Sequence, residues 1–201
     1  DEPALCCLVM VFEGFLDPGP LRDGELTLVS PHSRWLDDMV RAMAEDEPTD
    51  PATVRRRVIE FLHLAPSGHE PGDPLLGRAP SYHFWMRLDP PADERFPIAG
   101  GLSLRIGNDR NLTHYIGHVG YGVMSRARGH HYAERAVRLV LPLARRHGMS
   151  ELWITCNPDN TASRRTCERL GCRLVEIVPL PVTHPLFERG EREKCRYWMP
   201  L

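Results

Sequence analysis

One long amphipathic helix, set between two strand-like segments, restricts the possible folds of this chain more than any other feature. From residue 130 to residue 147 the sequence has helical spacing and keeps its charged side chains away from one apolar face. That face consists of Ala133, Ala136, Val137, Val140 and Ala144. Segments 114–124 and 151–157, which flank the helix, have the composition of strands. Because a helix that links two strands of one sheet makes them parallel, we expect a layered α/β fold.

The remaining elements follow from the same periodicities. Strands are predicted at 24–30, 82–88, 98–106, 172–179 and 194–199, and helices near 35–47, from 51 onward and at 160–170. The order is β-α-α-β-β-β-α-β-α-β-β, which predicts a central mixed β-sheet with helices on both faces. We expect 24–201 to form a single domain and 1–23 to be an N-terminal arm or an extra strand. Residues 66–80 hold four prolines and three glycines, and predict a long loop that is either a lid or simply mobile.

Charge, hydropathy and cysteine usage narrow the class of protein. A net charge of −2 argues against a general nucleic-acid binder, which needs a basic surface. The longest apolar run, 4–12, is shorter than the roughly 20 residues that span a membrane, and acidic residues precede it, unlike in a secretory signal. The six cysteines form no CxxC pair, which favours free thiols. We therefore expect a cytoplasmic enzyme or binding domain without nucleic-acid or membrane partners.

The segment 121–133 carries the clearest chemical signal. It predicts a strand, a short basic loop and the start of the long helix, whose first N–H groups and dipole favour an anion. Gly129 allows close backbone approach, and Arg126 and Arg128 add positive charge. The segment has neither the GK[ST] of the Walker loop nor the glycines of a dinucleotide fingerprint. It predicts a phosphate-binding turn; the alternative is two solvated arginines before an ordinary amphipathic helix.

The run Arg126-Ala-Arg-Gly-His-His131-Tyr-Ala resembles the [RQ]xxGx[GA] acetyl-CoA signature of the GNAT-type N-acetyltransferase superfamily. The downstream block Thr155-Cys-Asn157-Pro-Asp-Asn160-Thr-Ala-Ser163, followed by Glu168-Arg-Leu-Gly171, is similar to that family's strand, second cofactor helix and closing glycine. The element order matches as well, and the resemblance covers about residues 24–201. It implies a GNAT-like α/β fold and acetyl-CoA as the acetyl donor.

The resemblance also implies a set of cofactor-binding residues. They are Val123, Arg126, Arg128, Gly129, His130, His131, Tyr132, Ala133, Asn157, Asn160 and Ser163. Backbone amides of 126–133 would hold the pyrophosphate, while the backbone of Val123 and the second helix would contact the pantetheine arm. Two positions depart from the family pattern. His131 replaces a glycine or alanine, and Cys167 stands where the family often has a tyrosine that protonates the departing thiolate, so the general acid is not identified.

For the general base, the sequence offers His118. If 114–124 is a regular strand, His118 shares a face with Gly120 and Gly122, which leave room for another group to approach. Its reference pKa of about 6.5 suits proton transfer near neutral pH. The alternative is a histidine hydrogen-bonded within the sheet. His114 shares the same face, but no further ligand completes a metal site, and no metal is expected.

Together these observations predict an acetyltransferase that moves an acetyl group from acetyl-CoA to an amine by direct attack in a ternary complex. A small-molecule amine is favoured over a protein amine as the acceptor, and the protein would be a monomer or a homodimer. In this family the acceptor would be bound by the first two helices, the 66–80 loop and segment 179–193. The alternative is a non-catalytic acyl-CoA-binding sensor domain of the same fold.

Overall fold

The computed structural model describes residues 13–73 and 77–201, and these form two antiparallel sheets with helices around them. The strands of the first sheet are β1 (Arg22–Asp23), β2 (Leu26–Val29), β3 (His69–Glu70), β4 (Ser81–Leu88), β5 (Ile98–Arg105) and β6 (Val119–Val123). Those of the second are β7 (Glu151–Cys156), β8 (Arg173–Pro179) and β9 (Glu193–Pro200). The helices are α1 (Leu36–Asp46), α2 (Pro51–Leu64), α3 (Tyr132–Arg146), α4 (Thr161–Arg169) and α5 (Pro185–Glu188). The predicted α/β class and the predicted order of main elements are confirmed; β1, β3 and α5 are additions.

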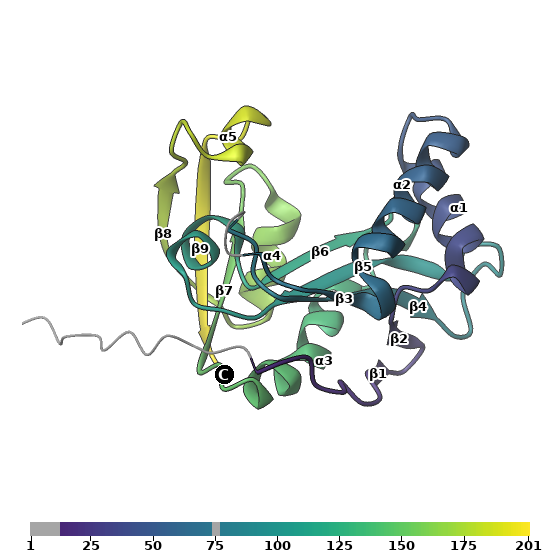
Figure 1. Ribbon diagram of the computed structural model, residues 1–201, viewed down its shortest axis with the longest axis horizontal. Helices are drawn as coiled ribbons and strands as arrows, with labels where there is room; N and C mark the ends of the chain where they lie inside the picture. Colours follow the sequence, from purple (N-terminus) through teal and green to yellow (C-terminus); the bar gives the residue numbers. More distant parts are fainter. Residues whose placement is uncertain (1–12, 74–76) are drawn as a thin grey trace, which may run out of the picture.

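The sheet is divided where the sequence predicted one continuous mixed sheet. The first sheet has the order β1-β2-β4-β5-β6, with β3 beside β4, and the second has the order β7-β9-β8. Every strand pair assigned in the described part of the chain is antiparallel. The crossover helix α3 therefore leads from the edge of one sheet to the edge of the other. In Figure 1 the second sheet stands upright at one end of the first, and α1 and α2 stand over the opposite end.

The division begins at residues 112–118, which are not the start of a regular strand. Leu112–Ile116 forms a π-helical turn, and the side chain of Asp109 accepts the Leu112 N–H at 3.0 Å. Gly117 follows with φ +79°, and a Cβ there would lie 2.9 Å from the backbone nitrogen of Thr155. Only glycine allows this close approach, so the turn and β7 meet here. The strand begins only at Val119, five residues later than predicted.

The apolar face of α3 is buried as predicted. Ala136, Val137, Val140 and Ala144 are fully enclosed and pack with β4 and β5 in the larger hydrophobic core. A smaller core lies on the other face of the first sheet, where α1 and α2 cover Trp85. Figure 1 shows α3 on the side of the sheet opposite α1 and α2. None of the helices in the described ranges is both long enough and apolar enough to cross a membrane.

The 66–80 segment has more structure than its composition predicted. A 3₁₀ turn at Pro66–Gly68 leads into β3, which pairs with the first residues of β4. Asp73 and Arg78 then form an isolated antiparallel bridge. This part of the chain thus lies along the edge of β4 that β2 leaves uncovered. Residues 74–76 lie outside the described residues.

Residues 13–21 lead into the short strand β1. Phe15 and Leu16 pack against the larger core, Leu21 is buried, and β1 pairs with β2. Residues 1–12, which include the apolar run and two cysteines, lie outside the described residues.

Candidate active site

A groove runs between the start of α3 and α4. It has a volume of about 590 Å³. Its lining residues include Tyr121, Val123, Arg128, Gly129, His131, Tyr132, Ala133, Asn160, Ser163 and Arg165. The groove therefore contains most of the residues that the sequence predicted for cofactor binding.

The turn before α3 is shaped for an anion. Gly129 has φ +90°, and His131 is the N-cap of α3 with φ +58°, a left-handed conformation that is uncommon for any residue except glycine. The first helical hydrogen bond runs from Arg135 N–H to the His131 carbonyl, so the N–H groups of the first turn have no partner within the helix. His131 supplies no side-chain cap. The positive end of the helix thus faces the groove beside Tyr132 and Ala133, which is the arrangement that binds phosphates.

Arg128 is the predicted arginine whose side chain lines the groove. Its Nε donates to the Val123 carbonyl at 3.2 Å, the backbone group that the sequence assigned to the pantetheine arm. The Arg128 guanidinium thus lies beside Val123, with a carboxylate oxygen of Asp46 3.9 Å away. A ligand that pairs with Val123 has to displace this hydrogen bond.

Three other predicted residues do not line this groove, although the prediction for Arg126 and His130 concerned their backbone amides. Arg126 donates its Nε to Glu45 at 2.8 Å and lies 4.3 Å from the centre of the Phe96 ring, because the 3₁₀ turn Ser125–Ala127 directs it toward the acidic end of α1. His130 stacks on Tyr132 and lines the same separate cavity as Arg126. The side-chain oxygen of Asn157 accepts from Lys194 at 2.8 Å. Local sequence could not show these contacts, since each partner is distant in the chain.

Beyond Val123 the groove continues into a polar space between β6 and β7. Arg105, Asn157, Asn160, Ser163 and Lys194 line this space, together with Tyr121. The Tyr121 hydroxyl lies 2.9 Å from Ser163 Oγ and 4.0 Å from Cys167 Sγ. Burial raises the pKa of Tyr121 well above its usual range. A tyrosine hydroxyl thus reaches the position of Cys167 from β6, a relationship that sequence reasoning missed because the two residues are 46 positions apart.

The predicted placement of His118 at the groove is wrong. The side chain is only 2% exposed. Its Nδ1 accepts the Trp153 N–H at 2.8 Å, and its Nε2 donates to the Gly107 carbonyl at 2.9 Å. Burial lowers the pKa of His118, so the ring is neutral, and it has no free lone pair to accept a proton. The structure has the alternative geometry, a histidine hydrogen-bonded to backbone groups, because β6 begins after this residue.

An apolar cavity of about 600 Å³ lies on the other face of the first sheet, under α1 and α2. Thioether, aromatic and aliphatic side chains make up most of its lining: Met39, Met43, Val58, Phe61, Trp85 and Met124. Gly101, Gly122 and Val123 form its floor beside the groove, and the Glu47–Arg57 ion pair lies at its rim. Phe61, Trp85, Gly101 and Gly122 also line an adjoining cavity of about 290 Å³ that reaches His83 and Arg105. The predicted acceptor segment 179–193 contributes to neither cavity, whereas the first two helices do.

Residues 13–73 and 77–201 contain no cluster of three or more His, Cys, Asp or Glu side chains that could hold a metal ion.

Comparisons with known proteins agree with this geometry. A family model described as an acetyltransferase (GNAT) domain matches residues 28–173. The microcin C7 self-immunity acetyltransferase MccE, solved in complex with acetyl-CoA and AMP, has a TM-score of 0.63 and 15% identity, over 89% of this chain and 94% of that one. A GNAT-family acetyltransferase from Bacillus anthracis has a TM-score of 0.60 and 12% identity, over 90% and 98%. A ribosomal-protein-S5-alanine acetyltransferase from Vibrio fischeri has a TM-score of 0.57 and 14% identity, over 90% and 96%.

A search of curated protein sequences finds no significant match. At these low identities the solved structures establish the fold, and the family model extends over most of the chain. The chain belongs to the GNAT acetyltransferase family.

Proposed function

We propose that this protein transfers an acetyl group from acetyl-CoA to an amine by direct attack in a ternary complex. One observation carries the proposal. The anion-binding turn at Gly129–Ala133 opens into a groove that passes Val123 and reaches both the space between β6 and β7 and an apolar cavity. Donor and acceptor would therefore reach β6 from separate openings, as a ternary complex requires. The fold shared with MccE, which was solved with acetyl-CoA, supports the identity of the donor.

The first turn of α3 would hold the pyrophosphate. Its N–H groups have no helical partner, and Gly129 presents no side chain toward the groove. Arg128 would exchange the Val123 carbonyl for a phosphate oxygen, which is a stronger, charge-assisted acceptor. The pantetheine arm would then pair with Val123 and pass Asn160 and Ser163.

Two groups are placed to stabilise the charges of acyl transfer. Because β6 is an edge strand, half of its backbone N–H groups are not used by β5, and one of them would donate to the oxyanion of the tetrahedral intermediate. Tyr121 lines both the groove and the space between the sheets, and burial raises the pKa of its hydroxyl, which therefore stays protonated. We assign Tyr121 as the proton donor to the departing thiolate.

The cysteines near this space support direct transfer over an acetyl-cysteine intermediate. Cys156 and Cys167 are both buried, and burial raises the pKa of each thiol. A thiol that stays protonated is a poor nucleophile. The amine itself therefore attacks the thioester.

The apolar cavity favours a small amine with an apolar body as the acceptor. Methionine side chains adapt to varied shapes, and Trp85 and Phe61 offer flat surfaces. A protein N-terminus is the second candidate acceptor, and peptides that represent it are tested together with the small amines.

The proposal is tested by thermal stabilisation with acetyl-CoA and by release of free thiol. The panel contains tyramine, histamine, spermidine and peptides that begin with serine or alanine. We expect stabilisation, and thiol release with at least one apolar amine. Stabilisation without thiol release across the panel would favour a non-catalytic sensor domain, and no stabilisation would reject the anion site as well.

A further inference from the structure

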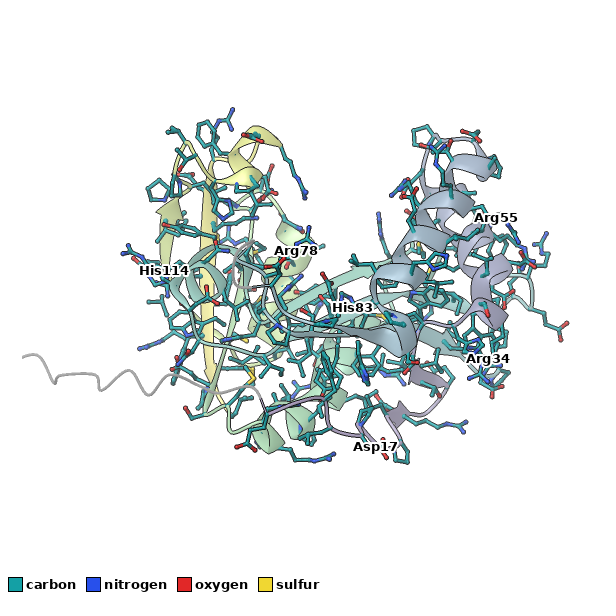
Figure 2. The ribbon with its side chains drawn as sticks, viewed as in Figure 1. Asp17, Arg34, Arg55, Arg78, His83 and His114 are labelled. Atoms are coloured by element: carbon teal, nitrogen blue, oxygen red, sulfur yellow. The ribbon has the colours of Figure 1, made fainter. Side chains whose placement is uncertain are left out.

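A histidine lines the 290 Å³ cavity that adjoins the apolar cavity under α1 and α2, and a carboxylate outside its lining pairs with this histidine. His83 projects from β4, and its Nε2 lies 3.0 Å from an Oε2 of Glu70 on β3. The two side chains are only 18% and 17% exposed. Phe61 of α2 packs edge-on against the imidazole, with ring centres 5.2 Å apart. Figure 2 labels His83 near the middle of the molecule, and Arg78 on the segment that carries Glu70.

The carboxylate fixes the tautomer of this histidine. An ionised carboxylate only accepts hydrogen bonds, so the neutral ring carries its proton on Nε2. The lone pair is then on Nδ1, for which the described residues provide no hydrogen-bond partner. A histidine with one nitrogen held by a carboxylate and the other unprotonated is arranged to accept a proton.

The strand register aligns His83 with the edge of β6. His83 lies opposite Ser103 on β5, and Ser103 lies opposite Gly120 on β6. With strands about 4.8 Å apart, the Cα of His83 is roughly 10 Å from that of Gly120. The Arg105 guanidinium covers Gly120, where an added Cβ would lie 3.1 Å from it, whereas Gly122, two residues further along β6, has nothing within 4 Å of its Cβ position. His83 and Gly122 line the same cavity. An amine over Gly122 would share this cavity with the imidazole.

The charges around His83 suit a base at neutral pH. Burial lowers the pKa of His83, its hydrogen bond to the Glu70 carboxylate opposes that effect, and the charge of Arg105 lowers the pKa further. Arg105, on β5, is itself bonded to the Gly117 carbonyl at 3.2 Å, and Arg78 lies 3.8 Å from Glu70. Phe61, from the helix packed above, carries no charge. His83 is thus neutral before the reaction, and Glu70 stabilises the imidazolium that forms during it.

We propose that His83 is the general base for the acceptor amine and that Glu70 is its positioning residue. This inference rests on the proposed function. The ammonium group of the acceptor gives one proton to His83 Nδ1. The neutral amine forms a C–N bond with the thioester carbon, and the C–S bond breaks. The nitrogen loses a second proton as the amide forms, the thiolate takes up a proton to become free CoA, and His83 releases its proton to solvent.

The test compares His83→Ala, Glu70→Gln and a control, His114→Ala, in the complete chain with acetyl-CoA and the best amine of the panel. His114 lies on the π-helical turn, away from both cavities (Figure 2). In His83→Ala we expect kcat/KM at pH 7 to fall about 10²- to 10⁴-fold, the acid limb of the pH profile to disappear, and added imidazole to restore part of the rate. In Glu70→Gln the acid limb should move to lower pH. Stabilisation by acetyl-CoA should not change in any variant.

Two results would overturn the inference. One is a His83→Ala variant that keeps the wild-type rate and acid limb. The other is a nitrogen-detected NMR titration in which the wild-type His83 carries its proton on Nδ1, or remains doubly protonated at pH 8. A wild-type protein that releases no thiol with any amine would instead reject the proposed function, so the two failures are distinguishable.

Discussion

His118 and Trp153 exchange two hydrogen bonds where the two sheets meet. The His118 N–H donates to the Trp153 carbonyl at 2.7 Å, and the Trp153 N–H donates to His118 Nδ1 at 2.8 Å. The imidazole thus replaces the backbone acceptor that a continuing β6 strand would have offered to β7. From this point the strands belong to different sheets, and the polar space between them begins. His118 therefore lies where the two sheets separate, although it does not line the groove.

Replacing His118 should destabilise the fold. In His118→Ala the buried Trp153 N–H and Gly107 carbonyl lose their partner, and each such loss costs roughly 1–3 kcal/mol. We expect the free energy of unfolding in urea to fall by about 2 kcal/mol or more. His114→Ala, at a half-buried position on the preceding turn, is the control and should change it far less. An unchanged unfolding free energy in His118→Ala would show that the hydrogen bonds of this histidine do not stabilise the junction of the two sheets.

The same histidine makes stability depend on pH. Burial holds the pKa of His118 in the folded protein below its value of about 6.5 in the unfolded chain. Between these two pKa values the unfolded chain binds more protons than the folded protein. The stability that His118 contributes to the fold is therefore complete above pH 6.5 and is lost as the pH falls toward the pKa of the folded state. We expect urea midpoints to decrease from pH 7 to pH 5. The decrease should be smaller in His118→Gln; an equal decrease would assign the effect to other histidines.

The parts of this protein that the sequence predicts are those fixed by local spacing. The apolar stripe of α3, the Asn160 cap of α4 and Pro51 at the start of α2 each depend on neighbours a few residues away. The π-helical turn before β6 depends instead on the contact of Gly117 with Thr155.

In the candidate site, too, the sequence predicts what neighbouring residues determine and misses what distant residues determine. The turn at Gly129 is local and lies where the sequence predicts, whereas the direction of Arg126 is decided by Glu45, 81 residues away. His83 and Glu70 are only 13 positions apart. Glu70 nevertheless belongs to β3, which lies in a segment whose prolines and glycines predict a loop, so the sequence does not predict the pair. Composition cannot reveal a pairing made by two residues.

A carboxylate at Gly129 should weaken acetyl-CoA binding. In Gly129→Asp the new charge would face the pyrophosphate, and the positive φ of +90° adds backbone strain. We expect the Kd from calorimetry to rise about tenfold or more. Gly190→Asp is a matched control, since Gly190 has φ +92° and an equally open Cβ position but lies away from the groove. Gly129→Ala separates strain from charge. If Gly129→Asp binds acetyl-CoA normally, the pyrophosphate is not at this turn.

Glycine at position 131 should stabilise the protein. A left-handed conformation costs a non-glycine residue roughly 1–2 kcal/mol, whereas glycine adds about 0.5–1 kcal/mol of unfolded-state entropy. His131→Gly should therefore raise the unfolding free energy by about 0.5 kcal/mol. His130→Gly, one residue earlier and without positive φ, should lower it. Identical effects of the two substitutions would argue against strain at His131.

Removal of the Tyr121 hydroxyl should slow departure of CoA without loosening its binding. In Tyr121→Phe the ring still fills the space beside Ser163, but the proton donor near Cys167 is gone. We expect kcat to fall about 10²-fold with little change in the Kd of acetyl-CoA. Tyr115→Phe is the control, because Tyr115 packs against His184 outside the groove. Acetyl donors with a more acidic leaving thiol need less help from an acid, so the defect should shrink with such donors. A defect of the same size with every donor would indicate that Tyr121 only supports the packing of α4.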